Sequence, residues 1–268
     1  MASMYAVYHG PEGIRAIAEQ VHGRTRRLAA ALRAGGFRLG SEAFFDTLLV
    51  ETDAAKAARI HEAARARRIN LRAVSPTQLG VALDETVTEG DLADLLEAFS
   101  LQPSAISNQP SSHPAVLPSI PKELQRTSPF LTHPVFNSHR SETEMLRYIR
   151  RLEARDLSLT AAMIPLGSCT MKLNATAEMV PVSWPGFGGI HPFAPREQTE
   201  GYRQLFADLE TWLAEITGFS RVSLQPNAGS QGEFAGLLVI RSYHRARGES
   251  HRRSGPAPPS IRSRSAPP

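Results

Sequence analysis

The sequence of 268 residues contains one cysteine, Cys169, and only three lysines. A single cysteine excludes an intrachain disulfide framework and a zinc site built from cysteines. No apolar run approaches the roughly 20 residues that a membrane-spanning helix needs. The first residues also lack the charged start and apolar core of a secretory signal peptide. The sequence therefore predicts a cytoplasmic protein with no metal site and no membrane partner.

The formal net charge of +4 comes from one short region. Residues 252–268 contain four of the 30 Lys and Arg residues and no acid, so the other 26 basic residues balance the 26 acidic ones. Binding to nucleic acid phosphates needs a basic surface, and four arginines without aromatic side chains for base stacking are a weak one. We therefore predict no nucleic-acid partner. The same region has one sizeable apolar residue, Ile261, and is expected to be disordered.

Residues 1–100 have the pattern of a small α/β domain. Apolar residues at helical spacing predict a helix over residues 11–34, which Gly35 and Gly36 end. Thr88 and Asp91 form a capping-box pair at the start of the last helix. The elements expected between these two helices are a strand at 44–50, a helix at 54–68 with Asn70 as a left-handed stop, and strands at 71–74 and 81–83.

The character of the sequence changes after residue 100. Residues 101–128 are rich in proline and serine, which is typical of a linker or an extended wrapping segment. Ser141 and Glu144 form a second capping-box pair, which predicts a helix to about Ala154. Residues 155–197 are expected to be irregular, and so long a loop is more often functional than idle. A helix over residues 200–217 follows, and Gly218 ends it.

The most informative stretch follows that helix. Residues 221–225 alternate between apolar and polar, which predicts a short strand, and a helix is expected from about Ser230, with Glu233 as its capping-box partner. A helix start offers free N–H groups and the positive end of the peptide dipoles, so it attracts a phosphate or another anion. The pattern also fits an ordinary capped helix after a strand, because it is neither a Walker A nor a GxGxxG sequence.

Several long strings resemble one family. Residues 127–139 read TSPFLTHPVFNSH, 163–174 read MIPLGSCTMKLN, 190–193 read IHPF, and 225–237 read QPNAGSQGEFAGL. Together with residues 1–100, which also fit, they resemble the P-protein of the glycine cleavage system (glycine decarboxylase). The resemblance covers about residues 1–253.

The resemblance implies both a fold and an activity. The fold would be α/β, a fragment of a pyridoxal-phosphate-dependent enzyme of fold type I, like aspartate aminotransferase. The activity would be decarboxylation of glycine, with transfer of the aminomethyl group to the lipoyl arm of the H-protein. The implied partners are glycine, lipoylated H-protein, and the remaining P-protein segments or a second subunit.

The resemblance also implies a set of site residues. Gly229, Ser230 and Gln231 would bind the phosphate of pyridoxal 5'-phosphate at the helix start. The turn of Ser168, Cys169 and Thr170 would lie near the mouth of the site, although a buried structural turn is an equally good interpretation. His191 is a candidate for the wall of the substrate site, but a histidine before a proline is more typical of a structural hydrogen bond. A Cys–His nucleophile has no supporting local signature.

No catalytic residue is predicted within this chain. The resemblance places the lysine that forms the Schiff base downstream of the helix ending near Arg247, and Lys172 matches a different string. We therefore expect a fragment that spans the junction of two halves: residues 1–100 end the N-terminal half, residues 129–250 begin the C-terminal half, and residues 251–268 are an out-of-frame tail. The isolated fragment is expected to be inactive. The alternative is a non-catalytic truncated subunit, or an interaction module that docks on a complete P-protein or on the H-protein.

Overall fold

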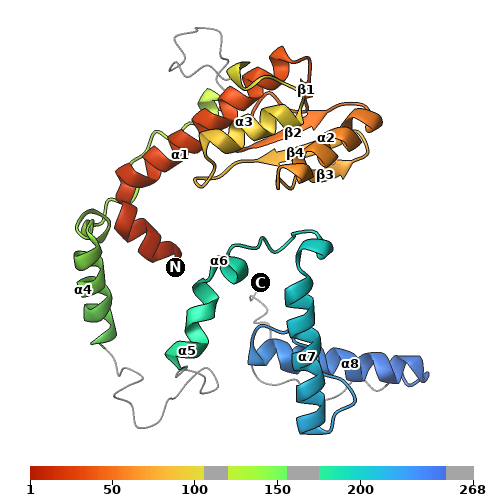
Figure 1. Cartoon of the computed structure of the whole chain (residues 1–268). Coiled ribbons are helices and arrows are strands. Elements are labelled where there is room, and N and C mark those ends of the chain that lie inside the picture. The colour runs from red at the N-terminus through yellow and green to blue at the C-terminus, as the bar shows by residue number, and fades with distance from the viewer. Residues whose placement is uncertain (106–119, 156–174, 252–268) are drawn as a thin grey trace, which may run out of the picture. The chain divides into compact units, whose positions relative to one another are not determined.

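The computed structural model describes residues 1–105, 120–155 and 175–251 (Figure 1). Two compact units make up the chain, residues 1–156 and residues 157–268. The predictions made for residues 168–170 and 252–268 lie outside the described residues. Within the described residues, no helix is long and apolar enough to cross a membrane.

The first unit is built on a four-stranded antiparallel sheet with the strand order β1-β2-β4-β3. In β2, Leu48 and Val50 are buried and pair with Val81 and Leu79 of β4, so the period-2 alternation places one apolar face inward. The elements in chain order are α1 (Ala2–Ala34), β1 (Arg38–Leu39), β2 (Thr47–Glu51), α2 (Ala54–Ala66), β3 (Arg72–Ser75), β4 (Gln78–Ala82), α3 (Glu89–Ala98) and η1 (Pro103–Ala105).

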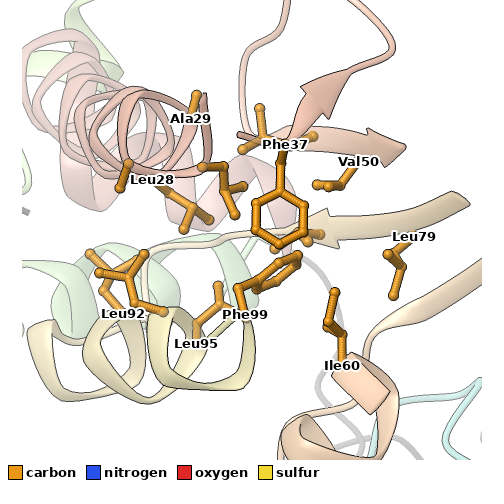
Figure 2. Close-up of a cluster of buried hydrophobic side chains, with 14 of the residues drawn as sticks. Leu28, Ala29, Phe37, Val50, Ile60, Leu79, Leu92, Leu95 and Phe99 are labelled. Atoms are coloured by element: carbon orange, nitrogen blue, oxygen red, sulfur yellow. The ribbon is translucent and has the colours of Figure 1, made fainter. Parts of the chain in front are cut away.

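One hydrophobic core joins the sheet to its helices (Figure 2). Phe37 and Phe99 meet edge to face, with ring centroids 5.1 Å apart, an arrangement that aromatic pairs favour. Leu28 and Leu32 of α1 and Leu96 of α3 are fully buried beside them. Residues 28–99 thus form a layer of helices packed on a sheet.

Several local details differ from the sequence prediction. Helix α1 begins at Ala2 and runs through a kink at Gly10, so a helical segment precedes the predicted start at residue 11. The two-residue strand β1 was not predicted, because only its pairing with β2 defines it. The last strand spans Gln78–Ala82, not residues 81–83. Arg68, with φ 62°, takes the left-handed conformation that was assigned to Asn70.

Residues 120–155 belong to the same unit and contain η2 (Lys122–Leu124), η3 (Pro134–Asn137) and α4 (Glu142–Glu153). Ser141 Oγ accepts a hydrogen bond from Glu144 N at 3.2 Å, and the Glu144 carboxylate reaches back to Ser141 N, so the predicted capping box is confirmed. The short helix η3 packs against α1.

The described part of the second unit is helical. Its elements are α5 (Thr176–Met179), η5 (Val180–Ser183), α6 (Pro185–Gly188), η6 (Arg196–Gln198), α7 (Glu200–Thr217) and α8 (Gly229–Ala246). Gly218, with φ 74°, ends α7 as predicted. The strand predicted at residues 221–225 is wrong: the segment forms no strand, because residues 175–251 provide no neighbouring strand. A strand needs a partner for its backbone N–H and C=O groups.

Candidate functional site

The start of helix α8 lies where the sequence places the phosphate-binding residues. The first intrahelical bond runs from Gly232 N to Ala228 O at 3.0 Å, so the helix does not use the N–H groups of Gly229, Ser230 and Gln231. Ala228, the cap residue, has no side-chain oxygen and makes no side-chain cap bond. The helix therefore presents three backbone donors at its positive end, an arrangement suited to a small anion.

The predicted capping box of Ser230 and Glu233 is wrong. Helix α8 begins at Gly229, one residue earlier than expected, so Ser230 already lies within the first turn. A cap residue must stand outside the helix to receive a bond from the third helical amide, and Ser230 does not. Gln231 closes the loop in its place, because its Oε1 accepts a hydrogen bond from Asn227 N at 2.7 Å.

The environment of these residues favours an anion only modestly. Gly229, Ser230 and Gln231 are all exposed, and the first turn of α8 carries no acidic residue. An exposed helix start stabilises a negative charge by about 0.3–1 kcal/mol. The geometry can thus orient a phosphate but needs further groups to bind it tightly.

His191 lies in a tight turn whose hydrogen bonds occupy one ring nitrogen. Phe193 N donates to His191 Nδ1 at 3.0 Å, and Ala194 N donates to the His191 carbonyl at 2.9 Å. In the neutral ring, an accepting Nδ1 leaves the proton on Nε2. The structural hydrogen bond considered for this histidine is therefore present. In the described part of the chain, no hydrogen bond links His191 to residues 229–231.

A contact that the sequence did not indicate fixes the segment before His191. Tyr202 of α7 donates its hydroxyl to the Phe187 carbonyl of α6 at 2.8 Å, and the two rings meet edge to face at 5.7 Å. Helix α6 is thereby tied to α7. A tyrosine at a helix start has no sequence pattern that indicates such a bond, so the sequence could not predict this contact.

Large apolar side chains of the second unit lie open to solvent. Phe193 is 90% exposed, Ile216 of α7 is 79% exposed, and Val239 of α8 is 69% exposed. Among residues 175–251 no side chain is buried. Monomeric proteins rarely leave so much apolar surface uncovered.

A pocket of about 390 Å³ lies in the first unit, between the segment after α2 and the start of α3. Its two carboxylates already have structural partners. Hydrogen bonds from the side chains of Thr86 and Thr88 lower the pKa values of Asp84 and Asp91, respectively. We therefore assign the Asp84 carboxylate to a turn and the Asp91 carboxylate to the cap of α3. Within the described residues, no cluster of His, Cys, Asp and Glu could hold a metal ion.

Known proteins match both residues 1–99 and nearly the whole chain. Residues 1–99 match the model of the family described as glycine cleavage system P-protein. The chain is 57% identical over 257 residues to the glycine dehydrogenase (decarboxylating) of Nostoc punctiforme, a match that covers 94% of this chain and 26% of that protein. It is also 57% identical over 252 residues to the glycine dehydrogenase (decarboxylating) of Thermosynechococcus vestitus, and this match again covers 94% of this chain and 26% of that protein.

These matches and the mixed helix-and-sheet fold define a fragment from a family of fold-type I enzymes, whose members use pyridoxal phosphate. The chain belongs to the glycine cleavage system P-protein family. It spans about a quarter of the length of the curated relatives it matches.

Proposed function

We propose that this chain supplies part of a P-protein that decarboxylates glycine and transfers the aminomethyl group to the lipoyl arm of the H-protein. The observation that carries the proposal is the uncapped start of α8, which lies inside the string that resembles the family's phosphate-binding segment. The family uses pyridoxal 5'-phosphate, and three unused backbone donors at a helix start fit its phosphate group.

Each site residue has a proposed task. Gly229, Ser230 and Gln231 hold the phosphate through their backbone N–H groups, and this fixes the orientation of the cofactor. Bound pyridoxal phosphate supplies an electron sink for the bond between the glycine α-carbon and its carboxylate. His191 presents Nε2–H to the substrate carboxylate, and Ser168, Cys169 and Thr170 complete the wall of the substrate site. No residue of this chain is assigned as catalytic.

The partners belong to the same proposal. They are glycine, lipoylated H-protein, and the remaining P-protein segments or a second subunit. A cytoplasmic location also remains a prediction.

The phosphate contact can be tested with one charge substitution. Ser230→Asp places a carboxylate where the phosphate is proposed to bind, so repulsion should weaken pyridoxal phosphate binding by about tenfold. The measurement is a spectrophotometric titration of the purified chain with pyridoxal phosphate and with pyridoxal, which lacks the phosphate. Ser242→Asp, an exposed substitution on the same helix three turns further on, is the control.

The expected result is a preference for pyridoxal phosphate over pyridoxal in the wild type and in Ser242→Asp, and no such preference in Ser230→Asp. Equal binding of both compounds by the wild type would refute the phosphate site.

A second candidate function follows from the exposed apolar faces of α7 and α8. We propose that they dock on the complementary segments of a P-protein, which would make this chain a binding subunit. Immobilised chain should then retain a complete P-protein, and Val239→Glu should reduce the retained amount severalfold, whereas Ser242→Asp should not. If the immobilised chain retained the H-protein but not the P-protein, the H-protein would be favoured as its docking partner.

A further inference from the structure

Helix α1 is interrupted at Gly10, and the interruption leaves backbone groups to be satisfied. Gly10 has φ 62° and ψ −176°, a conformation that residues with a Cβ atom rarely adopt. The next residue, Pro11, has no N–H to offer to the preceding turn. Carbonyls at such a helix end need partners from outside the helix.

Arg140, which lies 131 residues from His9 in the sequence, supplies one such partner. Its Nη1 donates to the His9 carbonyl at 2.6 Å, and its Nη2 donates to Asn137 Oδ1 at 3.4 Å. The guanidinium lies directly over the buried Gly10, where a Cβ atom would overlap it. Gly10 is therefore needed twice, for the backbone angle and for the space that Arg140 fills.

Further contacts extend this interface along α1. Two guanidinium groups lie near the ring of Phe130, that of Arg15 at 5.9 Å from the ring centre and that of Arg126 at 5.5 Å. Both distances are within the range of cation–π attraction. Leu131 has φ 50°, an unfavourable angle for leucine, and Asn137 Nδ2 donates to its carbonyl at 3.1 Å.

We propose that residues 7–15 of α1 form a docking surface for residues 126–140, and that the contact of Gly10 with Arg140 decides the register of docking. The surface fits a segment that contains the short helix η3 and presents an arginine ten residues after a phenylalanine. In the chain, the contact fastens residues outside the match to the P-protein family model, which ends at residue 99, onto the first helix inside it. Figure 1 shows this green segment running beside α1.

Hydrogen exchange of the full chain, followed by mass spectrometry, tests the proposal. In Arg140→Ala, amides of residues 130–137 should exchange about 3- to 10-fold faster, the range expected for losing one net hydrogen bond. Gly10→Ala should produce the same local increase, because its methyl group displaces the guanidinium. The double variant should exchange no faster than either single variant, because both remove the same contact.

Gly36→Ala is the matched control for Gly10→Ala. Gly36 also has a positive φ, 81°, but open space surrounds the position of its Cβ atom. Gly36→Ala should therefore strain the backbone without accelerating hydrogen exchange at residues 130–137. If residues 130–137 exchange at the wild-type rate in Arg140→Ala while the core at residues 28–99 stays protected, the docking surface is refuted. Additive effects in the double variant would likewise refute the register role of Gly10.

Discussion

Acidic residues at the start of α3 show how single side chains stabilise the first unit. The Thr88 hydroxyl donates to Asp91 Oδ2 at 2.6 Å and Thr88 N donates to the same oxygen at 2.7 Å, and these bonds lower the pKa of Asp91. Arg27 donates to both carboxylate oxygens of Glu89, at 3.0 and 2.5 Å, and this contact lowers the pKa of Glu89. Both carboxylates thus favour the folded state when they are ionised.

These pKa shifts predict how stability depends on pH. A carboxylate whose pKa is lowered by folding contributes stability above its unfolded pKa, and this contribution is lost as the pH falls through the folded value. We expect the contribution of these two carboxylates to the free energy of unfolding to be level above their ordinary pKa values of 4.5 and 3.8 and to decline as the pH falls below them. Urea titrations at a series of pH values measure this dependence.

Asp91→Asn should make the acid decline shallower and, by weakening the cap, should cost about 1 kcal/mol at pH 7. Asp94→Asn, on the same helix, is the control. An unchanged acid profile in Asp91→Asn would show that the capping carboxylate does not contribute to the pH dependence.

At the scale of an element, α3 shows how spacing translates into burial. Leu92, Leu95 and Leu96 are buried on the face that meets the sheet, and Phe99, just after the helix, completes that face. The capping box at Thr88 fixes the first turn and therefore the register of this apolar face. The i, i+3, i+4 spacing of the apolar residues predicted the buried face, and the pair of Thr88 and Asp91 predicted the capping box.

Removing one side chain from this face should create a cavity. Leu96 is fully buried, so Leu96→Ala should lower the free energy of unfolding by about 2–5 kcal/mol. Urea unfolding followed by circular dichroism is the measurement, because both tryptophans lie in the second unit. Leu124, 74% exposed, provides the control, and Leu124→Ala should change stability by less than about 0.5 kcal/mol. Equal losses in the two variants would contradict the assigned core.

At the scale of the whole molecule, burial is distributed unevenly. The hydrophobic cluster draws its buried members only from residues 28–99, whereas the described part of the second unit has none. The helices α7 and α8 nevertheless have the apolar periodicity of packed helices. The docking role proposed for α7 and α8 would cover these open faces.

Much of the candidate site was predictable in kind but not in detail. The glycine and small polar residues at positions 229–231 predicted a helix start there, and the structure begins α8 at Gly229 without a side-chain cap. The cap was misassigned because Ser230 and Glu233 have the right spacing but stand two residues too far into the helix, where Ala228 holds the cap position. Spacing alone does not fix the first helical residue, and the Asn227–Gln231 bond selected it here.

The sequence alone determined most of the long helices and two of their capping boxes, because those features depend on hydrogen bonds and contacts between residues three or four positions apart, but it missed the short helices between residues 176 and 198. Only the tertiary structure decided that residues 221–225 stay unpaired, that Arg38–Leu39 becomes a strand, and that Arg140 covers Gly10. Each of these outcomes depends on whether a distant segment lies within hydrogen-bonding reach. Local periodicity carries no information about that distance.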